Sequence, residues 1–512
     1  MTPKFLKTLG LAAVTAFAFV GSAFAGKSND TLVWTTDREQ AVADPYYNNT
    51  RELVIMGHAV WDGLLFRALD TGEYKPLLAT SYKWVDNVTL EFDLRDDVVF
   101  HDGSTFDADD VVYTVNHVSN EDNGVLTFQN VKWMKNAEKL GSHKVRIHLH
   151  EPFPAALAYL SNAVFMMPQG HYDGAPMKAD GKKDFGAVKP IGTGPYKIVD
   201  VIAGDRINMV RNENYMKNGP KGQPQIGKLV FRTIKEMNTQ IAELLTGGID
   251  WMWDVPKDQA ESLEAQGQVT VENAKTMRVS YLAFDVDGDS GVKYFTDLRV
   301  RAAVAHAINR ESITKNLVGP ASVVIPSACH PDQFGCAQDV TKWEYDPAKS
   351  KALLKEAGYP NGFEFDIYAY RQREYTEAVI GDLAEVGIKA NLKYMQYRAL
   401  RDLVWKGATP INHMTWGSNS IPDVSAITSH FFSGGRDDPA KDPEVIQNLQ
   451  VADTSVEPAV REKHYRAALE KISANLYWLP MFTYAKYYVY SKDLDFKATP
   501  DEIPRFYTAK WK

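Results

Sequence analysis

Alternating strand and helix patterns between residues 346 and 416 constrain the fold of this chain most. Short apolar runs typical of strands lie at 363–370, 388–394 and 411–416, with helical patterns between them at about 374–386 and 399–406. Successive strands joined by helices run substantially parallel in one sheet, because each helix has to pack back on a sheet face. The sequence therefore predicts an α/β fold for this part of the chain.

Helix signals also flank this run. They extend from Asp297 through Asn316, and a further helix begins with Asp346 as its cap and Pro347 in its first turn. Another helix is predicted at about 458–476, and an aromatic segment follows at 478–490.

An earlier stretch, residues 79–115, predicts a second structural unit. Leu90, Phe92 and Leu94 alternate with charged residues, which indicates a half-buried strand. An Asp-Gly turn follows at 102–103, and Asp107 is placed to cap a helix whose first turn is acidic. The predicted order is strand, turn, strand and capped helix.

The first residues predict export. Lys4 and Lys7 precede an apolar run at 9–20 and the small-residue site Ala23-Phe24-Ala25, which is the pattern of a cleavable signal peptide at 1–25. No later apolar run reaches the length of a membrane span, so we expect an exported, soluble chain in the periplasm.

The charge of the chain disfavours a nucleic-acid partner. Removal of residues 1–25 takes away two lysines and no acid, so the formal charge falls from −8 to −10. The remaining chain is long enough for two or more domains.

Two cysteines, Cys329 and Cys336, lie seven positions apart. In an exported chain this spacing favours a local disulfide. A metal site that includes His330 is the alternative, but it lacks an evident fourth ligand. We therefore predict a disulfide and no metal.

Two glycine-rich segments resemble cofactor motifs without matching them. The turn at 192–195 leads into a strand rather than a helix, and GQPQIGK at 222–228 is followed by Leu229 where a phosphate-binding loop needs Ser or Thr. The sequence thus predicts no cofactor.

Two loops are candidate ligand sites, because open α/β sheets bind ligands beyond the carboxyl ends of their strands. Arg371 and Arg373 follow the first strand of the run and offer planar forks for a carboxylate, or else pair with nearby glutamates. After the last strand, Trp416 offers an apolar wall, and Ser418 and Asn419 offer uncharged hydrogen-bonding groups.

Four aromatic residues complete the set of candidate ligand contacts. Tyr46 and Tyr47 lie in a polar loop after an Asp-Pro turn, Trp253 belongs to a Trp-Met-Trp cluster, and Tyr281 lies near the start of a strand. Packing in a core is the alternative for each of them.

Several motifs together resemble one family. They lie at 61–65, 76–79, 90–96, 100–103, 109–111, 192–196, 297–310 and 345–360. In this order they resemble the family 5 extracytoplasmic solute-binding proteins, the dipeptide, oligopeptide and nickel-binding components of ABC importers.

The resemblance implies a two-lobed periplasmic binding protein fold that closes like a clamp. It implies a first lobe at 26–275 with an inserted subdomain at about 58–188, a second lobe at 276–485, and a return to the first lobe at 486–512. A solute held between the lobes would then be passed to an inner-membrane permease by a monomeric protein.

The resemblance also bears on the solute. Dipeptide-binding relatives receive the peptide carboxylate on an Arg that corresponds to Arg371, and the amine on an Asp where this chain has Ser418 or Asn419. The His of nickel-binding relatives is missing near Pro422. The expected solute is a small organic molecule, anionic or peptide-like, and the expected protein is not an enzyme. A secreted hydrolase and a protein-binding receptor or chaperone-like module are the alternatives, although no hydrolase motif is present.

Overall fold

The computed structural model describes residues 25–512, apart from the side chain of Asn419. The predicted signal peptide lies outside the described residues except for Ala25. Within the described part, no helix is both long and apolar enough to cross a membrane.

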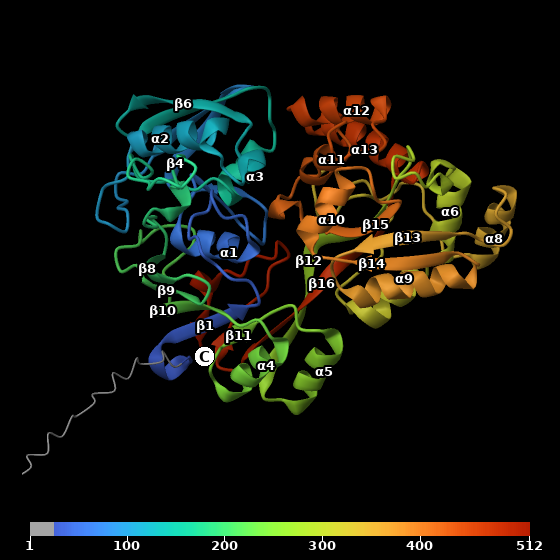
Figure 1. Ribbon diagram of the computed structural model, residues 1–512. Coiled ribbons are helices and arrows are strands. Elements are labelled where there is room, and N and C mark those ends of the chain that lie inside the picture. The colour runs from blue at the N-terminus through green and yellow to red at the C-terminus, as the bar shows by residue number, and fades with distance from the viewer. Residues whose placement is uncertain (1–24) are drawn as a thin grey trace, which may run out of the picture.

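One sheet of ten strands extends through both halves of the described part of the molecule (Figure 1). Its order across the sheet is β14 (Lys389–Tyr394), β13 (Glu364–Ala369), β15 (Ile411–Trp416), β12 (Val269–Phe284), β16 (Trp478–Ser491), β11 (Trp251–Met252), β1 (Thr31–Thr36), β10 (Lys228–Thr233), β9 (Arg206–Arg211) and β8 (Tyr196–Ile202).

Parallel pairs occupy both halves of this sheet, and two long antiparallel strands join them. β13 is parallel to β14 and β15, while β1 is parallel to β10 and β11. Between these groups β12 pairs antiparallel with β16, from Val269 opposite Ser491 to Ala283 opposite Trp478. The prediction of parallel strands between residues 363 and 416 is confirmed.

The molecule has two lobes, on the left and right of Figure 1. Hydrophobic clusters of buried side chains fill them. The first lobe carries α1 (Arg51–Val60), α4 (Met237–Thr246) and α5 (Lys257–Gln266), together with β1, β8, β9, β10 and β11. We keep the lobe limits near residues 275 and 485 as a proposal. The membership of the clusters supports it, except that Ile421 and Ala426 pack in the cluster of the first lobe.

The stretch 79–115 supplies two strands of a smaller sheet in the first lobe and the start of a helix beside it. The order of this sheet is β4 (Ala79–Asp86), β5 (Thr89–Leu94), β7 (Lys144–Leu149) and β6 (Met134–Gly141), with α2 (Ala108–Val118) and α3 (Ala156–Asn162) nearby. The Asp107 side chain accepts from the Asp109 N–H, and the Asp110 side chain accepts from the Asp107 N–H. The predicted strand and capped helix are confirmed. Short strand pairs complete the lobe: β2 (Leu65–Arg67) with β3 (Tyr74–Pro76), and β17 (Leu494–Asp495) with β18 (Lys510–Trp511).

The second lobe packs helices around β12 to β15. They are α6 (Leu298–Ala307), α7 (Arg310–Ile313), α8 (Pro347–Glu356), α9 (Arg373–Glu385), α10 (Tyr397–Val404), α11 (Ser425–Phe431), α12 (Pro443–Thr454) and α13 (Pro458–Ala474).

The helix signals predicted at 297–316 are confirmed, but they form two helices and a π-helical turn rather than one continuous helix. The backbone becomes extended at Ile308. The Asn309 side chain accepts a hydrogen bond from the Ser312 N–H and so caps a new helix, α7. A π-helical turn follows at Thr314–Val318. An internal Asn of this kind competes with the helix by bonding to the backbone, which is the physical reason for the break.

Candidate functional site

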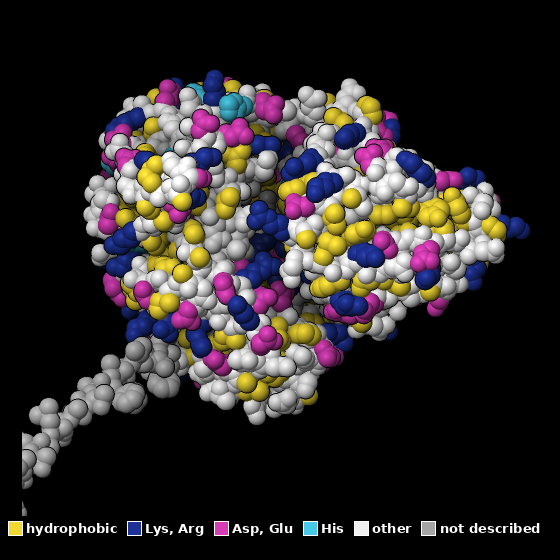
Figure 2. Space-filling view, in the orientation of Figure 1, with side chains coloured by type: hydrophobic (Ala, Val, Ile, Leu, Met, Phe, Trp, Pro, Cys, Tyr) yellow, Lys and Arg dark blue, Asp and Glu magenta, His cyan; other side chains and the backbone are white. Residues whose placement is uncertain are grey.

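A cleft of about 930 Å³ opens between the two lobes. Residues from both lobes line it, from segments that include 36–38, 49–54, 235–240, 253–254, 278, 370–372, 396–398, 415–417 and 486. In Figure 2 dark-blue side chains of Lys and Arg gather in this hollow.

The cleft forms where strands of both lobes end. The segments that follow β1, β10 and β11 in the first lobe, and β13, β14 and β15 in the second, all supply lining residues. Because these strands belong to parallel groups, their carboxyl ends meet at one edge, as expected for ligand sites on open α/β sheets.

Helix starts add positive character to the cleft. α4, α9 and α10 begin beside lining residues, and none of their N-cap residues, Glu236, Gln372 and Gln396, makes a side-chain cap bond. The first N–H groups of a helix lack partners within the helix and carry partial positive charge. Three such ends facing one cleft favour an anionic group inside it.

Charged side chains reinforce this field. Three carboxylates line the cleft, namely Asp37, Glu52 and Asp254, against a larger set of cationic residues: Arg38, Arg51, Lys235, Arg278, Arg371, Arg398 and Lys486. The whole chain has a formal charge of −8, so the sign of the cleft is opposite to that of the molecule.

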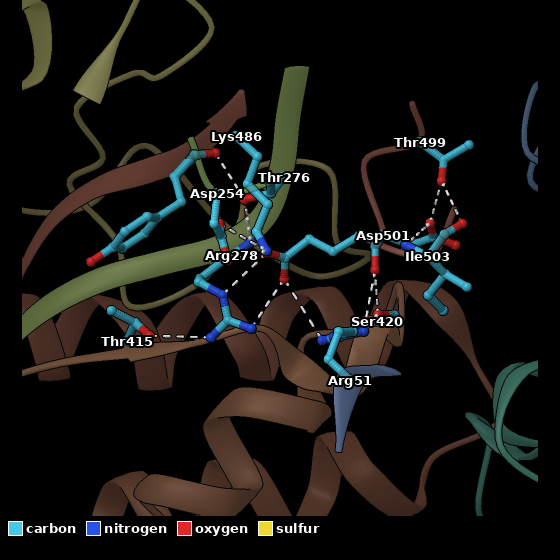
Figure 3. A network of polar contacts seen from close by, with 12 residues as sticks. Arg51, Asp254, Thr276, Arg278, Thr415, Ser420, Lys486, Thr499, Asp501 and Ile503 are labelled. Carbon is cyan, nitrogen blue, oxygen red and sulfur yellow. Dashed lines mark hydrogen bonds and ion pairs between the residues drawn. The ribbon is translucent and has the colours of Figure 1, made fainter. Parts of the chain in front are cut away.

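Three of these cations, Arg51, Arg278 and Lys486, lie close together (Figure 3), and each forms an ion pair with Glu502. Its carboxylate lies 3.1 Å from the Arg278 guanidinium, 3.3 Å from Lys486 Nζ and 3.7 Å from the Arg51 guanidinium. Only 1% of Glu502 is exposed. Burial alone would raise the pKa of Glu502, but the charges of Arg278, Lys486 and Arg51 outweigh it and hold that pKa far below the usual range.

Asp254 forms a second centre of the same group. Its carboxylate lies 3.2 Å from Lys486 Nζ and 3.5 Å from the Arg371 guanidinium. Enclosure by the cleft walls raises the pKa of Asp254, but Lys486 and Arg371 outweigh this effect and lower it below the usual value. Both carboxylates therefore remain ionised and neutralise part, not all, of the cationic charge around them.

Backbone strain clusters around the cleft. Several non-glycine residues here adopt left-handed φ values, which are uncommon and are found preferentially at functional sites. They are Asp254 (55°), Gln372 (34°), Ser418 (50°), Ser420 (62°) and Glu502 (57°).

Three of the predicted contacts line the cleft. Trp253 lies beneath Lys486, whose Nζ is 3.8 Å from the ring centre. Arg371 follows β13, with its Nε buried and without a partner among the described residues. Trp416 ends β15, stacks on His430 and donates its indole N–H to the Ala426 carbonyl.

The structure places other predicted residues away from the cleft. Arg373 points outward and pairs with Glu377 at 2.7 Å. Tyr281 is buried and stacks on Trp478 at 3.4 Å in the core of the second lobe.

The two neighbouring tyrosines also pack within the first lobe. The Tyr46 hydroxyl is buried and donates to the Phe165 carbonyl, and the Tyr47 hydroxyl lies 2.9 Å from His117 Nε2. Ser418 is 1% exposed, behind the cleft-lining Gly417, and the side chain of Asn419 is outside the described part.

Sequence reasoning missed every charged residue of the cleft lining except Arg371. Five of the missed charged residues form ion pairs at the centre of the site: Arg51, Asp254, Arg278, Lys486 and Glu502. A signal was present for two of them. Lys486 is a single charge within the aromatic run 478–490, and Arg278 interrupts the apolar strand that leads to Phe284. A charge inside a buried strand needs a partner, so such residues indicate a polar site.

Cys329 and Cys336 form a disulfide, as predicted. Among residues 25–512 no group of three or more His, Cys, Asp or Glu side chains is arranged to hold a metal ion.

Comparison with known proteins agrees with this architecture. Residues 73–438 match the model of the bacterial extracellular solute-binding proteins, family 5 (middle region). The glutathione-binding protein GsiB of Salmonella paratyphi A is 27% identical, over 96% of this chain and 96% of the relative.

Solved structures share the two-lobed fold. An ABC transporter-associated periplasmic binding protein, DppA of Helicobacter pylori with the peptide STSA, has a TM-score of 0.79 at 23% identity over 96% of this chain and 99% of its own. MoaA of A. tumefacien R10, in complex with mannopinic acid, has a TM-score of 0.78 at 21% identity over 94% and 99%. The resemblance seen in the sequence is confirmed, as is the prediction of a binding protein rather than an enzyme. The chain belongs to the bacterial extracellular solute-binding proteins of family 5.

Proposed function

We propose that this protein is the periplasmic solute-binding component of an ABC importer and captures a small anionic or peptide-like solute between its lobes. The observation that carries the proposal is the excess of cationic side chains and open helix starts in the cleft of a chain with net negative charge. A ligand carboxylate would replace water around these groups in an enclosed site, where charge-assisted hydrogen bonds are strong.

The relatives support the same solute class. Glutathione, the peptide STSA and mannopinic acid are the compounds that three of these relatives bind, and each carries at least one carboxylate. The shared chemical group, a carboxylate, therefore defines the proposed solute class.

Arg371 is the proposed carboxylate contact, with Trp253 and Trp416 as apolar walls. The Arg371 guanidinium lies 5.8 Å from the centre of the Tyr484 ring, which supports its position. Its unpartnered Nε offers a donor beside the Nη2 that faces Asp254. A carboxylate that accepts from this edge would make a bidentate pair.

Substitution of Arg371 tests this assignment. We expect Arg371→Ala to weaken binding of reduced glutathione, or of the tightest member of a short-peptide panel, by about 2 to 5 kcal/mol, because a buried charged pair is lost. Isothermal titration calorimetry measures the affinity, and thermal unfolding without solute shows whether the fold is intact.

Two comparisons make the test specific. Arg373→Ala removes an equal charge from an exposed position two residues away, and we expect it to leave the affinity unchanged. An amide of the same solute, which lacks the carboxylate charge, should bind weakly to the unmodified protein. Equal binding of the acid and the amide would contradict an anionic solute.

Location, partner and oligomeric state belong to the same proposal. We infer cleavage after Ala25, delivery of the solute to an inner-membrane permease, and a monomeric protein. Intact mass of the exported protein would show whether residues 1–25 are removed, and analytical ultracentrifugation would show the oligomeric state.

A protein-binding receptor remains the second candidate function. Small molecules would then produce no thermal stabilisation, whereas a tight solute must raise the unfolding temperature by mass action.

A further inference from the structure

Asp254 and Arg371 form an ion pair between the two lobes. Asp254 follows β11 of the first lobe and Arg371 follows β13 of the second, and their closest atoms, Oδ2 and Nη2, are 3.5 Å apart. Lys486, on β16, holds the same carboxylate at 3.2 Å. A carboxylate of the protein thus already contacts Arg371 and Lys486, the two cations that a solute carboxylate would bind.

The geometry of Arg371 shows that this occupation is incomplete. Asp254 reaches one nitrogen of the guanidinium edge, whereas the adjacent Nε is buried without a partner among the described residues. The side-chain oxygen Oε1 of the next residue, Gln372, is likewise buried and unpartnered. An unpaired buried donor costs free energy, so a ligand that satisfies both guanidinium nitrogens would bind in preference to Asp254.

Two features of Asp254 favour its displacement from Arg371. Its side chain is 37% exposed to the cleft, and its backbone has a φ of 55°, which costs free energy for a residue other than glycine. After displacement from Arg371 the carboxylate would still have Lys486 as its partner (Figure 3).

We propose that Asp254 is an internal substitute for the solute: its carboxylate occupies the Arg371 subsite in the empty protein, links the lobes there, and is exchanged for the solute carboxylate on binding. This proposal rests on the proposed function, because it concerns the same cleft. It makes Asp254 a determinant of affinity that competes with the solute, rather than a contact that attracts it.

The first test needs no solute. Single cysteines at the exposed positions Lys135 and Lys351, one in each lobe, can carry spin labels, because the native cysteines are joined in a disulfide. Electron–electron double resonance then gives the distance between the lobes in the ligand-free protein. We expect Asp254→Asn to lengthen or broaden this distribution, since the link to Arg371 is weakened, and Asp258→Asn, four residues further on in α5, to leave it unchanged. Coincident distributions for Asp254→Asn and the unmodified protein would overturn the proposal.

The second test uses reduced glutathione as the probe. Removal of the competitor should tighten its binding by about tenfold in Asp254→Asn, because more of the protein is in the binding-competent state. Weaker binding would overturn the proposal and assign Asp254 to an ammonium group of the solute. If glutathione and all the short peptides fail to bind the unmodified protein, the proposed function fails, while the distances still decide on the internal substitute.

Discussion

Glu502 is the residue on which the charges of the cleft depend most. Its side chain is 2% exposed and faces three cations, Arg51, Arg278 and Lys486. Without it those cations would repel one another in an enclosed place, where the free-energy cost of unpaired charge is high.

We therefore expect Glu502→Gln to lower the free energy of unfolding at pH 7 by about 3 to 5 kcal/mol. The folded pKa of Glu502 lies below its unfolded value of about 4.3, so its contribution is full above that value and is lost as the pH falls towards the folded pKa. Urea unfolding of both proteins from pH 7 down to pH 3 should show a difference that is largest at neutral pH and becomes smaller below about pH 4.

Glu213→Gln is the control for this change. Glu213 is 74% exposed and pairs with Arg211, so its loss should have little effect at any pH. A pH-independent difference between Glu502→Gln and the unmodified protein would show that the effect arises from packing rather than from charge.

At the residue scale, the sequence predicted some residues that line the cleft and missed those that tertiary structure brings together. Arg371 and Trp416 were predicted because the ends of strands are recognisable in a sequence, and Trp253 was predicted because it belongs to a Trp-Met-Trp cluster. Arg51 and Glu502 could not be associated, since they lie 451 positions apart and meet only when the end of the chain returns to the first lobe. Tyr281 and Tyr46 are of a residue type that is common in binding sites, but both lie in hydrophobic cores. Their burial could not be predicted, because it depends on the packing of elements that are distant in the sequence.

Among the elements, the loop 329–336, which the disulfide closes, supports one wall of the cleft. Gln333, within this loop, donates to the carbonyls of Ile421 and Asp423, and the Phe334 N–H donates to the Pro422 carbonyl. The supported segment, 421–423, begins four positions after the cleft-lining residue Gly417. The loop therefore fixes the start of α11 relative to β15.

We expect the double substitution Cys329→Ser and Cys336→Ser to lower the free energy of unfolding by about 2 kcal/mol, because a short closed loop restricts the unfolded chain. Urea unfolding followed by tryptophan fluorescence measures this change. A reductant should lower the free energy of unfolding of the unmodified protein by the same amount and leave that of the variant unchanged. Identical unfolding curves before and after reduction would show that the loop is held by its other contacts alone.

Elements with strong local signals were predicted well, whereas those decided by context were not. The cap at Asp107 and the strand at 411–416 lie where the sequence placed them. The helix expected at 297–316 is broken at Asn309, whose side chain finds a backbone partner that the apolar pattern does not reveal. The aromatic segment at 478–490 forms β16, whose role in linking the lobes depends on its distant partners β11 and β12.

For the whole molecule, the two-lobed architecture followed from the order of family motifs rather than from strand patterns. Alternating strands and helices in 346–416 predicted an α/β unit, but not that its sheet continues into the first lobe. That continuity depends on β12 and β16, which pair across 269–491 and so are not apparent from local sequence.

The position of β16 in the sheet has a consequence for how the protein folds. Although β16 is among the last strands of the chain, it lies between β12 and β11 in the middle of the sheet. Pairing that links such distant residues is slow, because the loop between them must be closed first.

We expect pulse-labelled hydrogen exchange during refolding to show protection of β5 and β7, which pair within 89–149, before protection of β11 and β12. The small sheet is the internal control because its partners are close in sequence. Simultaneous protection of both sheets would contradict this order. The central strands β11 and β12 thus become linked only after residues 478–491 have paired with them. A chain that is still being made or exported therefore cannot complete its cleft.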